Sequence, residues 1–420
     1  MKSLRRLPVT IKKRHDRVIL MPFGVDDRKK VVEVLDFVDA LSPACVEEEL
    51  GKVLKTFQCR HANLSDGLRE NYERAIGNTD DTADRSEQSR LLAGAYLSME
   101  YAIEGAALFN PSIVALPKST DEELQWLMSM RATGEGHLSS VVFESGKITD
   151  KGEFIVDSRE AHSGRTPIEN DKSKGQGNYT LKLKAEKKLS SLLIFPRSKE
   201  ESRGVEDLRL VRFIDDAGGI TYYGTYTAYD GFSITPKLLE TKDFRTIAIH
   251  NLKGQCAQNK GMALFPRKID DQFVMCSRND GRNLYIMYSK DLCHWENMKK
   301  LAGPKYPWEG RIIGNCGSPI ETDAGWLLLT HAVGPMRRYT LSAMLLDRHD
   351  PTKIIGRLCR PLMEPLEEER EGYVPNVLYT CGALVHKDTL YIPYAMSDEA
   401  TSVATVELAE LLTTLQNEGP

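Results

Sequence analysis

Apolar residues recur at three- and four-residue intervals through the first quarter of the chain. Val31, Leu35 and Val38 mark one such face, and this spacing brings side chains to one side of a helix. Ser42-Pro43 places an N-cap residue before a proline at the first helical position, which predicts a second helix. Small and apolar residues over 89–104 predict a third. The spacing therefore predicts a helical extension over residues 1–103.

After Asn110-Pro111 the hydrophobic period changes to two. Short runs rich in β-branched and aromatic residues are bounded by Gly, Asp and Asn, which is typical of strands joined by tight turns. Five strand pairs recur, at 126–131 with 139–143, 220–229 with 232–235, 273–278 with 283–288, 325–331 with 339–346, and 389–394 with 401–408. A polar insertion over 144–189 lengthens the first interval, and the others are close to the roughly 40–50 residues of a propeller blade. The pattern predicts an all-β five-bladed β-propeller over residues 104–420.

A charged or polar residue follows or ends the first strand of each pair: Arg131, Asp230, Arg278, His331 and Asp398. In a propeller such residues come from the inner part of each blade and meet at the central channel. A β-sandwich or two smaller β domains would also accommodate the strands, but neither would need these residues at equivalent places. Each residue taken alone is equally well explained as a turn residue. The five together favour the propeller.

Composition narrows the classes of function. The 420 residues are 41% apolar and 28% charged, as in ordinary globular proteins. The net charge of −4 gives no basic field to attract nucleic acid or an anionic membrane. No apolar run is long enough to span a bilayer, and no secretory signal is recognisable. The eight cysteines form no Cys-x-x-Cys pair, so the sequence predicts no metal site, no organic cofactor and a cytoplasmic protein.

The segment 202–212 carries the most specific candidate chemistry. Glu206 and Asp207 are adjacent carboxylates that follow a glycine and lie between Arg203 and Arg209. Cleavage of a glycosidic bond needs a carboxylic acid placed beside the sugar. On residue types alone, a solvated ion pair of little energetic value explains the cluster at least as well.

Several ordered motifs together resemble glycoside hydrolase family 130, whose members act on β-mannosides. The resemblance covers about residues 104–408. It rests on the segments Asn110-Pro-Ser-Ile-Val114, Gly204-Val-Glu-Asp207-Leu-Arg209, Tyr226-Thr-Ala-Tyr-Asp230, Leu264-Phe-Pro-Arg267-Lys268, Gly325-Trp-Leu327 before His331, and Glu371-Gly-Tyr-Val-Pro-Asn376. The resemblance implies a five-bladed propeller that binds a small carbohydrate, with no nucleic acid or membrane partner. It leaves the oligomeric state open.

The resemblance also implies a mechanism. Asp207 matches the family's general acid, which protonates the glycosidic oxygen through a hydroxyl of the substrate mannose. Inorganic phosphate then attacks as a co-substrate with inversion, giving α-mannose 1-phosphate from β-1,2- or β-1,4-linked mannosides. The positions that match phosphate ligands are Arg131, Lys260, Arg278 and His331. Sugar contacts are expected from Asn110, Asp230, Asn279, Asp280, Tyr339, Asn376 and Asp398.

Two expectations concern the acid itself. To hold a proton near neutral pH, Asp207 needs a pKa above its ordinary value. Because nearby cations lower a carboxyl pKa, we expect Arg203 and Arg209 to turn outward or towards Glu206.

Two other functions remain open. The first is a β-mannosidase that uses water on the same scaffold, with Glu206, Glu309 or Glu371 as the base. The second is a propeller that only binds carbohydrate or protein.

Overall fold

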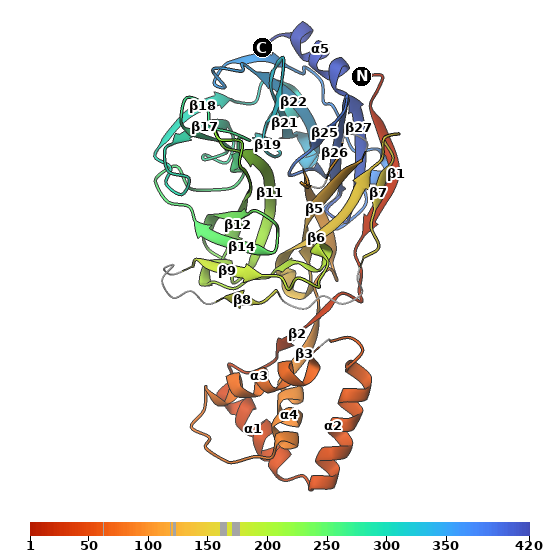
Figure 1. Ribbon diagram of the computed structural model, residues 1–420, viewed down its shortest axis with the longest axis vertical. Coiled ribbons are helices and arrows are strands. Elements are labelled where there is room, and N and C mark those ends of the chain that lie inside the picture. Colours follow the sequence, from red (N-terminus) through yellow and green to blue (C-terminus); the bar gives the residue numbers. More distant parts are fainter. Residues whose placement is uncertain (62, 118, 121–122, 160–165, 170–176) are drawn as a thin grey trace. The chain divides into compact units, whose positions relative to one another are not determined.

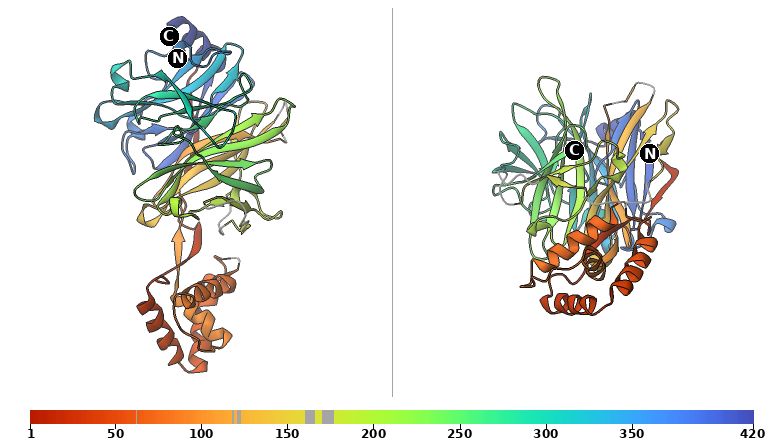
Figure 2. Two further views of the ribbon diagram at one scale, coloured as in Figure 1. Left: turned by 90° about the vertical axis from the view of Figure 1, so that its left-hand side faces the viewer. Right: turned by 60° about the horizontal axis from the view of Figure 1, so that its bottom comes forward.

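A computed structural model describes residues 1–61, 63–117, 119–120, 123–159, 166–169 and 177–420. Parts of the predicted polar insertion, residues 160–165 and 170–176, lie outside this description. The chain forms two compact units. The sheet unit comprises residues 1–13, 104–159 and 166–420, and the helical unit comprises residues 14–103. Figures 1 and 2 show the helices of one and the sheets of the other.

In its described residues, the helical unit contains four helices and a two-stranded antiparallel sheet. The helices are α1 (Arg28–Asp39), α2 (Pro43–Phe57), α3 (Leu64–Ile76) and α4 (Glu87–Tyr96), and β2 (Val18–Pro22) pairs with β3 (Ser98–Ala102). As predicted, Ser42 caps α2: its Oγ accepts a hydrogen bond from the Cys45 backbone N–H. Helix α3 was not predicted from the sequence, and the third predicted helix extends over residues that pair in β3.

Glycine allows α3 and α4 to approach closely. A Cβ on Gly94 would lie 2.1 Å from the carbonyl oxygen of Leu68, a distance that no real side chain tolerates. The apolar residues of α3 recur at three- and four-residue spacing and are buried against α1 and α4, at Leu64, Leu68, Tyr72 and Ala75.

The sheet unit is built from five groups of mainly antiparallel strands. The first group contains β4 (Ala107–Ala115), β5 (Leu124–Thr133), β6 (Ser139–Ile148), β7 (Phe154–Val156) and β10 (Leu193–Ile194). The second contains β11 (Gly204–Ile214), β12 (Ile220–Tyr229), β13 (Ile234–Thr241), β14 (Thr246–Asn251), β9 (Tyr179–Lys182) and β8 (Ile168–Glu169). A parallel contact between Gly204 and Ser139 joins these two groups into one sheet.

Three further groups complete the unit. The third contains β15 (Ala263–Leu264), β16 (Phe273–Ser277), β17 (Leu284–Ser289) and β18 (Asn297–Ala302). The fourth contains β19 (Ile312–Asn315), β20 (Ile320–Thr322), β21 (Gly325–Val333), β22 (Tyr339–Leu346) and β23 (Ile354–Arg357). The fifth contains β24 (Leu378–Tyr379), β25 (Leu384–His386), β26 (Thr389–Met396), β27 (Ala400–Glu407) and β1 (Arg5–Lys12), and helix α5 (Leu408–Glu418) ends the chain.

All five predicted strand pairs are confirmed as antiparallel pairs, formed by β5–β6, β12–β13, β16–β17, β21–β22 and β26–β27. One boundary differs from the prediction. Residues 1–13 do not belong with the helices, because β1 pairs with β27 over Arg5–Lys12. Sequence spacing could not reveal this contact, since the two strands are nearly four hundred residues apart.

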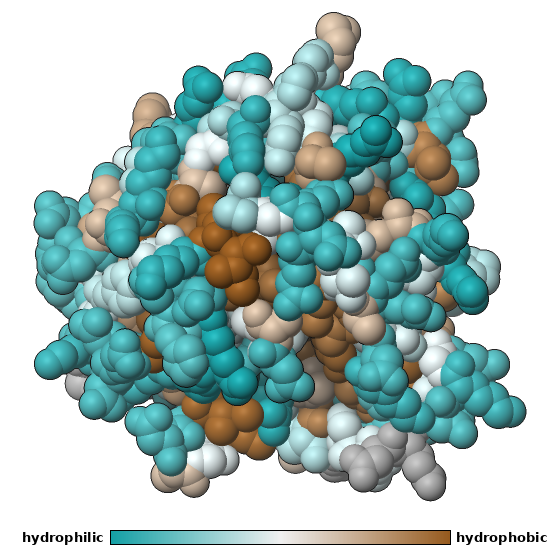
Figure 3. Space-filling model, turned by 90° about the horizontal axis from the view of Figure 1, so that it is seen from above, coloured by the Kyte–Doolittle hydropathy of each residue, from teal (hydrophilic) through white to brown (hydrophobic). Residues whose placement is uncertain are grey.

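Successive strand groups pack face to face, and the last packs against the first. Apolar clusters bury residues of the first and second groups, the second and third, the third and fourth, and the fourth and fifth. Ala395 of β26 packs on Ala107 and Phe109 of β4. In Figure 1 the five groups follow one another around the unit in chain order. Seen from above, apolar side chains reach the surface only in small patches among polar ones (Figure 3).

A buried glutamate recurs just before the first strand of three groups. Glu201, Glu309 and Glu369 each end a short 3₁₀ turn and accept backbone N–H groups of that turn. Each also faces a cation, at 3.4 Å from Lys237, 2.7 Å from Arg357 and 2.8 Å from Arg6 respectively. Since an unpaired buried charge is costly, each pair fixes the point at which its strand group begins.

Replacing Glu369 by alanine should therefore lower the free energy of unfolding by about 3 kcal/mol, because Arg6 and the Tyr394 hydroxyl lose their acceptor. The matched control is Glu368→Ala, one residue away and exposed, for which a change below about 0.5 kcal/mol is expected. Urea denaturation measures both. Equal effects of the two substitutions would contradict this role.

Candidate active site

Two β-bulges bring Asn110 and Asp207 together. The pairing register shifts between Phe109 and Ser112 in β4 and between Glu206 and Arg209 in β11. Asn110 and Asp207 lie in these bulges with φ of 51° and 55°, and a bulge re-aims the side chain that it carries. Asn110 Nδ2 donates a hydrogen bond of 2.7 Å to Asp207 Oδ1, and both residues are buried.

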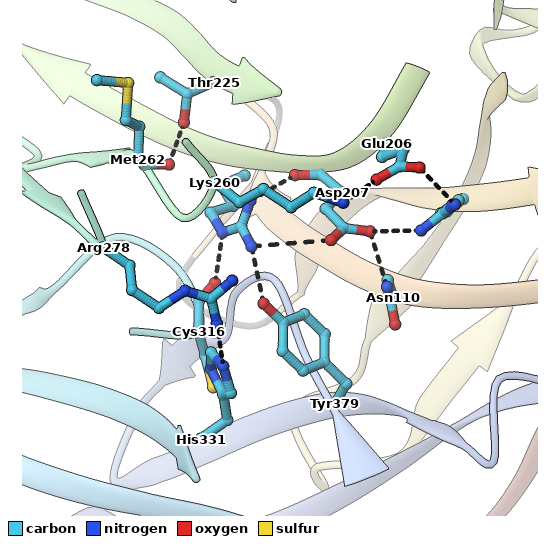
Figure 4. A network of polar contacts seen from close by, with 12 residues as sticks. Asn110, Glu206, Asp207, Thr225, Lys260, Met262, Arg278, Cys316, His331 and Tyr379 are labelled. Atoms are coloured by element: carbon cyan, nitrogen blue, oxygen red, sulfur yellow. Dashed lines mark hydrogen bonds and ion pairs between the residues drawn. The ribbon is translucent and has the colours of Figure 1, made fainter. Parts of the chain in front are cut away.

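Two cations and a second carboxylate lie beside this pair (Figure 4). Arg131 of β5 donates from Nη2 to Glu206 Oε1 at 2.8 Å, and its Nη1 is 3.6 Å from Asp207 Oδ1. Lys260, between β14 and β15, donates from Nζ to the other Glu206 oxygen at 2.6 Å. Glu206 therefore bridges Arg131 and Lys260, two of the predicted phosphate ligands.

Arg209 departs from the prediction. Arg203 is exposed as expected, but Arg209 is 2% exposed and lies against Asp207, with 4.0 Å between its Nη2 and Asp207 Oδ2. It donates from Nη1 to the Asp207 backbone oxygen, from Nε to the Cys316 carbonyl oxygen and from Nη2 to the Tyr379 hydroxyl, at 2.9, 2.9 and 2.8 Å. The bulge turns both side chains inward, which simple strand alternation did not predict.

The predicted direction of the Asp207 pKa is also wrong. Burial acts to raise the pKa of Asp207, but three cations outweigh it and lower the pKa below the ordinary value: Arg131, Arg209 and Lys260. The hydrogen bond from Asn110 acts in the same direction. Asp207 is therefore ionised.

Asp398, which follows β26, behaves in the opposite way. Burial raises the pKa of Asp398 from 3.8 to about 7, and the charge of Asp207 adds to this, although Arg131 and Arg337 oppose it. Asp398 has the backbone φ of 51° typical of a tight turn. The two aspartates share Arg131 as a neighbouring charge, and they differ in protonation near neutral pH.

Arg278 and His331 form a second part of the site (Figure 4). Arg278 Nη1 donates to His331 Nε2 at 3.1 Å. Burial, Arg278 and Arg209 hold the pKa of His331 well below its ordinary value, so the ring is neutral. Tyr339 stacks on this ring with a centroid distance of 6.1 Å. The Tyr379 ring meets the His331 ring edge-on, which links Arg278 to the Arg209 contacts.

Four predicted sugar ligands are engaged locally instead. The carboxylates of Asp230 and Asp280 accept backbone N–H groups of their own turns. Asn279 donates to the Cys256 carbonyl oxygen, and Asn376 accepts from Arg370 Nε. Among the described residues, no hydrogen bond joins the side chains of these four directly to Asp207. Asp and Asn favour such turns because their side chains bond the backbone two residues on.

Sequence reasoning missed two parts of the network. Arg209 belonged to the motif that carried the resemblance, but its inward direction depends on the bulge. Tyr379 had no local signal at all, since it reaches Arg209 from 170 residues away. Within the described part of the chain, no cluster of His, Cys, Asp and Glu could hold a metal ion, and no helix is long and apolar enough to cross a membrane.

Comparison with known proteins defines the family. Residues 134–417 match the model of glycoside hydrolase family 130, described as β-1,4-mannooligosaccharide phosphorylase. The chain belongs to this family.

Among its relatives, a 1,2-β-oligomannan phosphorylase of Thermoanaerobacter sp. (strain X514) is 37% identical over 51% of this chain and 72% of its own length. A β-1,2-mannobiose phosphorylase of Listeria innocua is 31% identical over 54% of this chain and 64% of its own length. A structure of β-1,2-mannobiose phosphorylase from Listeria innocua in complex with β-1,2-mannobiose is similar in fold, with a TM-score of 0.57 at 21% identity over 76% of this chain and 94% of that chain.

The raised pKa of Asp398 predicts a pH-dependent stability difference. Between its unfolded value of 3.8 and about 7, the folded protein binds a proton at Asp398 that the unfolded chain does not, so this residue lowers stability as pH rises. Asp398→Asn removes the effect. Relative to wild type, the variant should gain about 4 kcal/mol between pH 4 and pH 8, because the folded and unfolded pKa values differ by about three; urea denaturation at several pH values measures this. A pH-independent difference would contradict the assignment.

Proposed function

We propose that this protein cleaves β-mannosides with inorganic phosphate, with inversion, to give α-mannose 1-phosphate and a shortened sugar. The observation that carries this proposal is the buried Asp207 held beside Arg131 and Lys260. Cationic side chains beside an acid can bind an anionic nucleophile. The relatives that act on β-1,2- and β-1,4-linked mannosides as phosphorylases support the same reaction.

A five-bladed propeller is the arrangement we propose for the sheet unit, with the helical unit as a separate domain. The packing of each strand group on the next, and of the fifth on the first, supports a closed ring. The site residues then come from the inner parts of all five blades. The free thiols of the cysteines fit the reducing cytoplasm.

In the proposed reaction, Asp207 gives its proton to the glycosidic oxygen through a hydroxyl of the mannose. The bond from C1 to that oxygen breaks, and a phosphate oxygen forms the new bond to C1 from the opposite face. Arg131, Lys260, Arg278 and His331 hold the phosphate, and Asn110, Tyr339 and Asp398 contact the sugar. No organic cofactor takes part.

Hydrolysis of the same bond is less well supported. It needs a second carboxylate that is free to activate water. Glu206 bridges two cations, and Glu309 is buried in a 3₁₀ turn against Arg357. Glu371 is exposed.

Phosphate dependence tests the reaction directly. With β-1,2- or β-1,4-mannobiose as substrate, we expect mannose 1-phosphate to form only when inorganic phosphate is present. Chromatography of the products, with and without phosphate, measures this. Release of free mannose at the same rate in both conditions would identify a hydrolase instead.

The substitution Asp207→Asn should lower turnover by about 10² to 10⁴-fold, the usual range for loss of a general acid. The control is Asp347→Asn, because Asp347 accepts only backbone N–H groups of an exposed turn and asparagine preserves that cap. Its turnover should equal that of wild type. Wild-type turnover in Asp207→Asn would exclude the acid role of Asp207. Absence of turnover in the wild type would instead leave a protein that only binds carbohydrate.

A further inference from the structure

The cations proposed to hold phosphate are also among those that keep Asp207 ionised. Arg131 and Lys260 both lower the pKa of Asp207, although a general acid must carry a proton before it can give one away. In the free protein, therefore, Asp207 cannot protonate a leaving group.

We infer that the binding of an oxyanion beside Arg131 and Lys260 drives a proton from solvent onto Asp207. The inference rests on the proposed function, because it takes these residues as the phosphate site. The co-substrate would thereby prepare the acid as well as supply the nucleophile.

The geometry makes the coupling strong. Asp207 is buried, and its Oδ1 is 3.6 Å from Arg131 Nη1. Glu206, between Arg131 and Lys260, is buried as well. Charges interact more strongly in buried surroundings than in water. A second negative charge beside the same cations reduces their net attraction for the Asp207 carboxylate and adds repulsion, so the protonated form becomes favoured.

Glu206 strengthens the coupling between anion binding and protonation of Asp207. Both Glu206 oxygens already accept from the two cations, at 2.8 and 2.6 Å, so the charges of Arg131 and Lys260 are already partly compensated. A multiply charged anion placed there leaves the site with excess negative charge. Taking up a proton relieves this excess.

Other groups that face Asp207 could take the proton instead, and they set the design of the test. The charged and titratable neighbours are Arg131, Glu206, Arg209, Lys260, Arg278, His331, Tyr379, Cys381 and Asp398. The competitors near neutral pH are His331, which is neutral, and Asp398. Because the pKa of Asp398 is about 7, Asp398 is already largely protonated at pH 6.

Protons balance over the proposed reaction cycle. The proton enters from solvent with the anion and passes to the glycosidic oxygen when the bond to C1 breaks. Asp207 is then ionised again, as it is in the free protein.

Calorimetric titration with sulfate at pH 6 tests the inference, since sulfate does not itself titrate there. Binding is measured in two buffers of different ionisation enthalpy, which reports the protons taken up. We expect about one proton per sulfate in wild type and in the Asp347→Asn control, and none in Asp207→Asn. Between pH 5 and pH 6, where Asp398 stays largely protonated, sulfate affinity should fall by up to about tenfold in wild type and stay nearly constant in Asp207→Asn.

Proton uptake that persists in Asp207→Asn would overturn the inference and assign the proton to His331 or Asp398. An infrared difference spectrum separates the two readily, because only a carboxylic acid adds a C=O band. Sulfate binding without proton uptake in wild type would also overturn the inference, while phosphate-dependent turnover would leave the proposed function standing. Failure of both sulfate and phosphate to bind wild type would remove the anion site itself.

Discussion

The buried guanidinium of Arg209 joins three strand groups of the sheet unit. It donates to the Asp207 backbone in the second group, to the Cys316 carbonyl oxygen beside β19 in the fourth, and to the Tyr379 hydroxyl in the fifth. A buried charge is tolerated only when its donors are satisfied. These acceptors therefore have to stay in place together, and the position of the site depends on that constraint.

The same guanidinium links architecture to chemistry. By holding the backbone of Asp207, it supports the bulge that turns the carboxylate towards Asn110. By its charge, it favours the ionised form of that carboxylate. If Asp207 is the general acid, as we propose, the cations that fix it also deprotonate it, so some event in the cycle has to restore the proton. Asp398 shows the contrast: burial without an ion pair to a described residue raises its pKa to about 7.

The recurring elements explain how a series of packed strand groups can carry such a site. Each strand group buries one apolar face on the previous group and one on the next. The side chains that take no part in this packing can therefore differ from group to group. Glutamates 201, 309 and 369 fix the entry to three of these inner regions through the same 3₁₀ turn. The polar residues that each group contributes to the site therefore differ, while the packing between groups repeats.

The sequence by itself determined the five strand pairs, most of the helices and the motif that contains Asp207, because hydrophobic period and turn residues are local properties. Asp207, Arg131 and Lys260 were selected as site residues from the motifs alone, and the structure places them together. Tertiary structure alone decided the pairing of β1 with β27, the inward direction of Arg209, the role of Tyr379 and the ionisation of Asp207. Each of these features depends either on contacts between residues far apart in the chain or on a one-residue bulge. Neither long-range contacts nor bulges leave a periodic pattern in the sequence. Asp230 and Asp280 were predicted as sugar ligands from the sequence, and the tertiary structure shows that their carboxylates accept backbone N–H groups of their own turns.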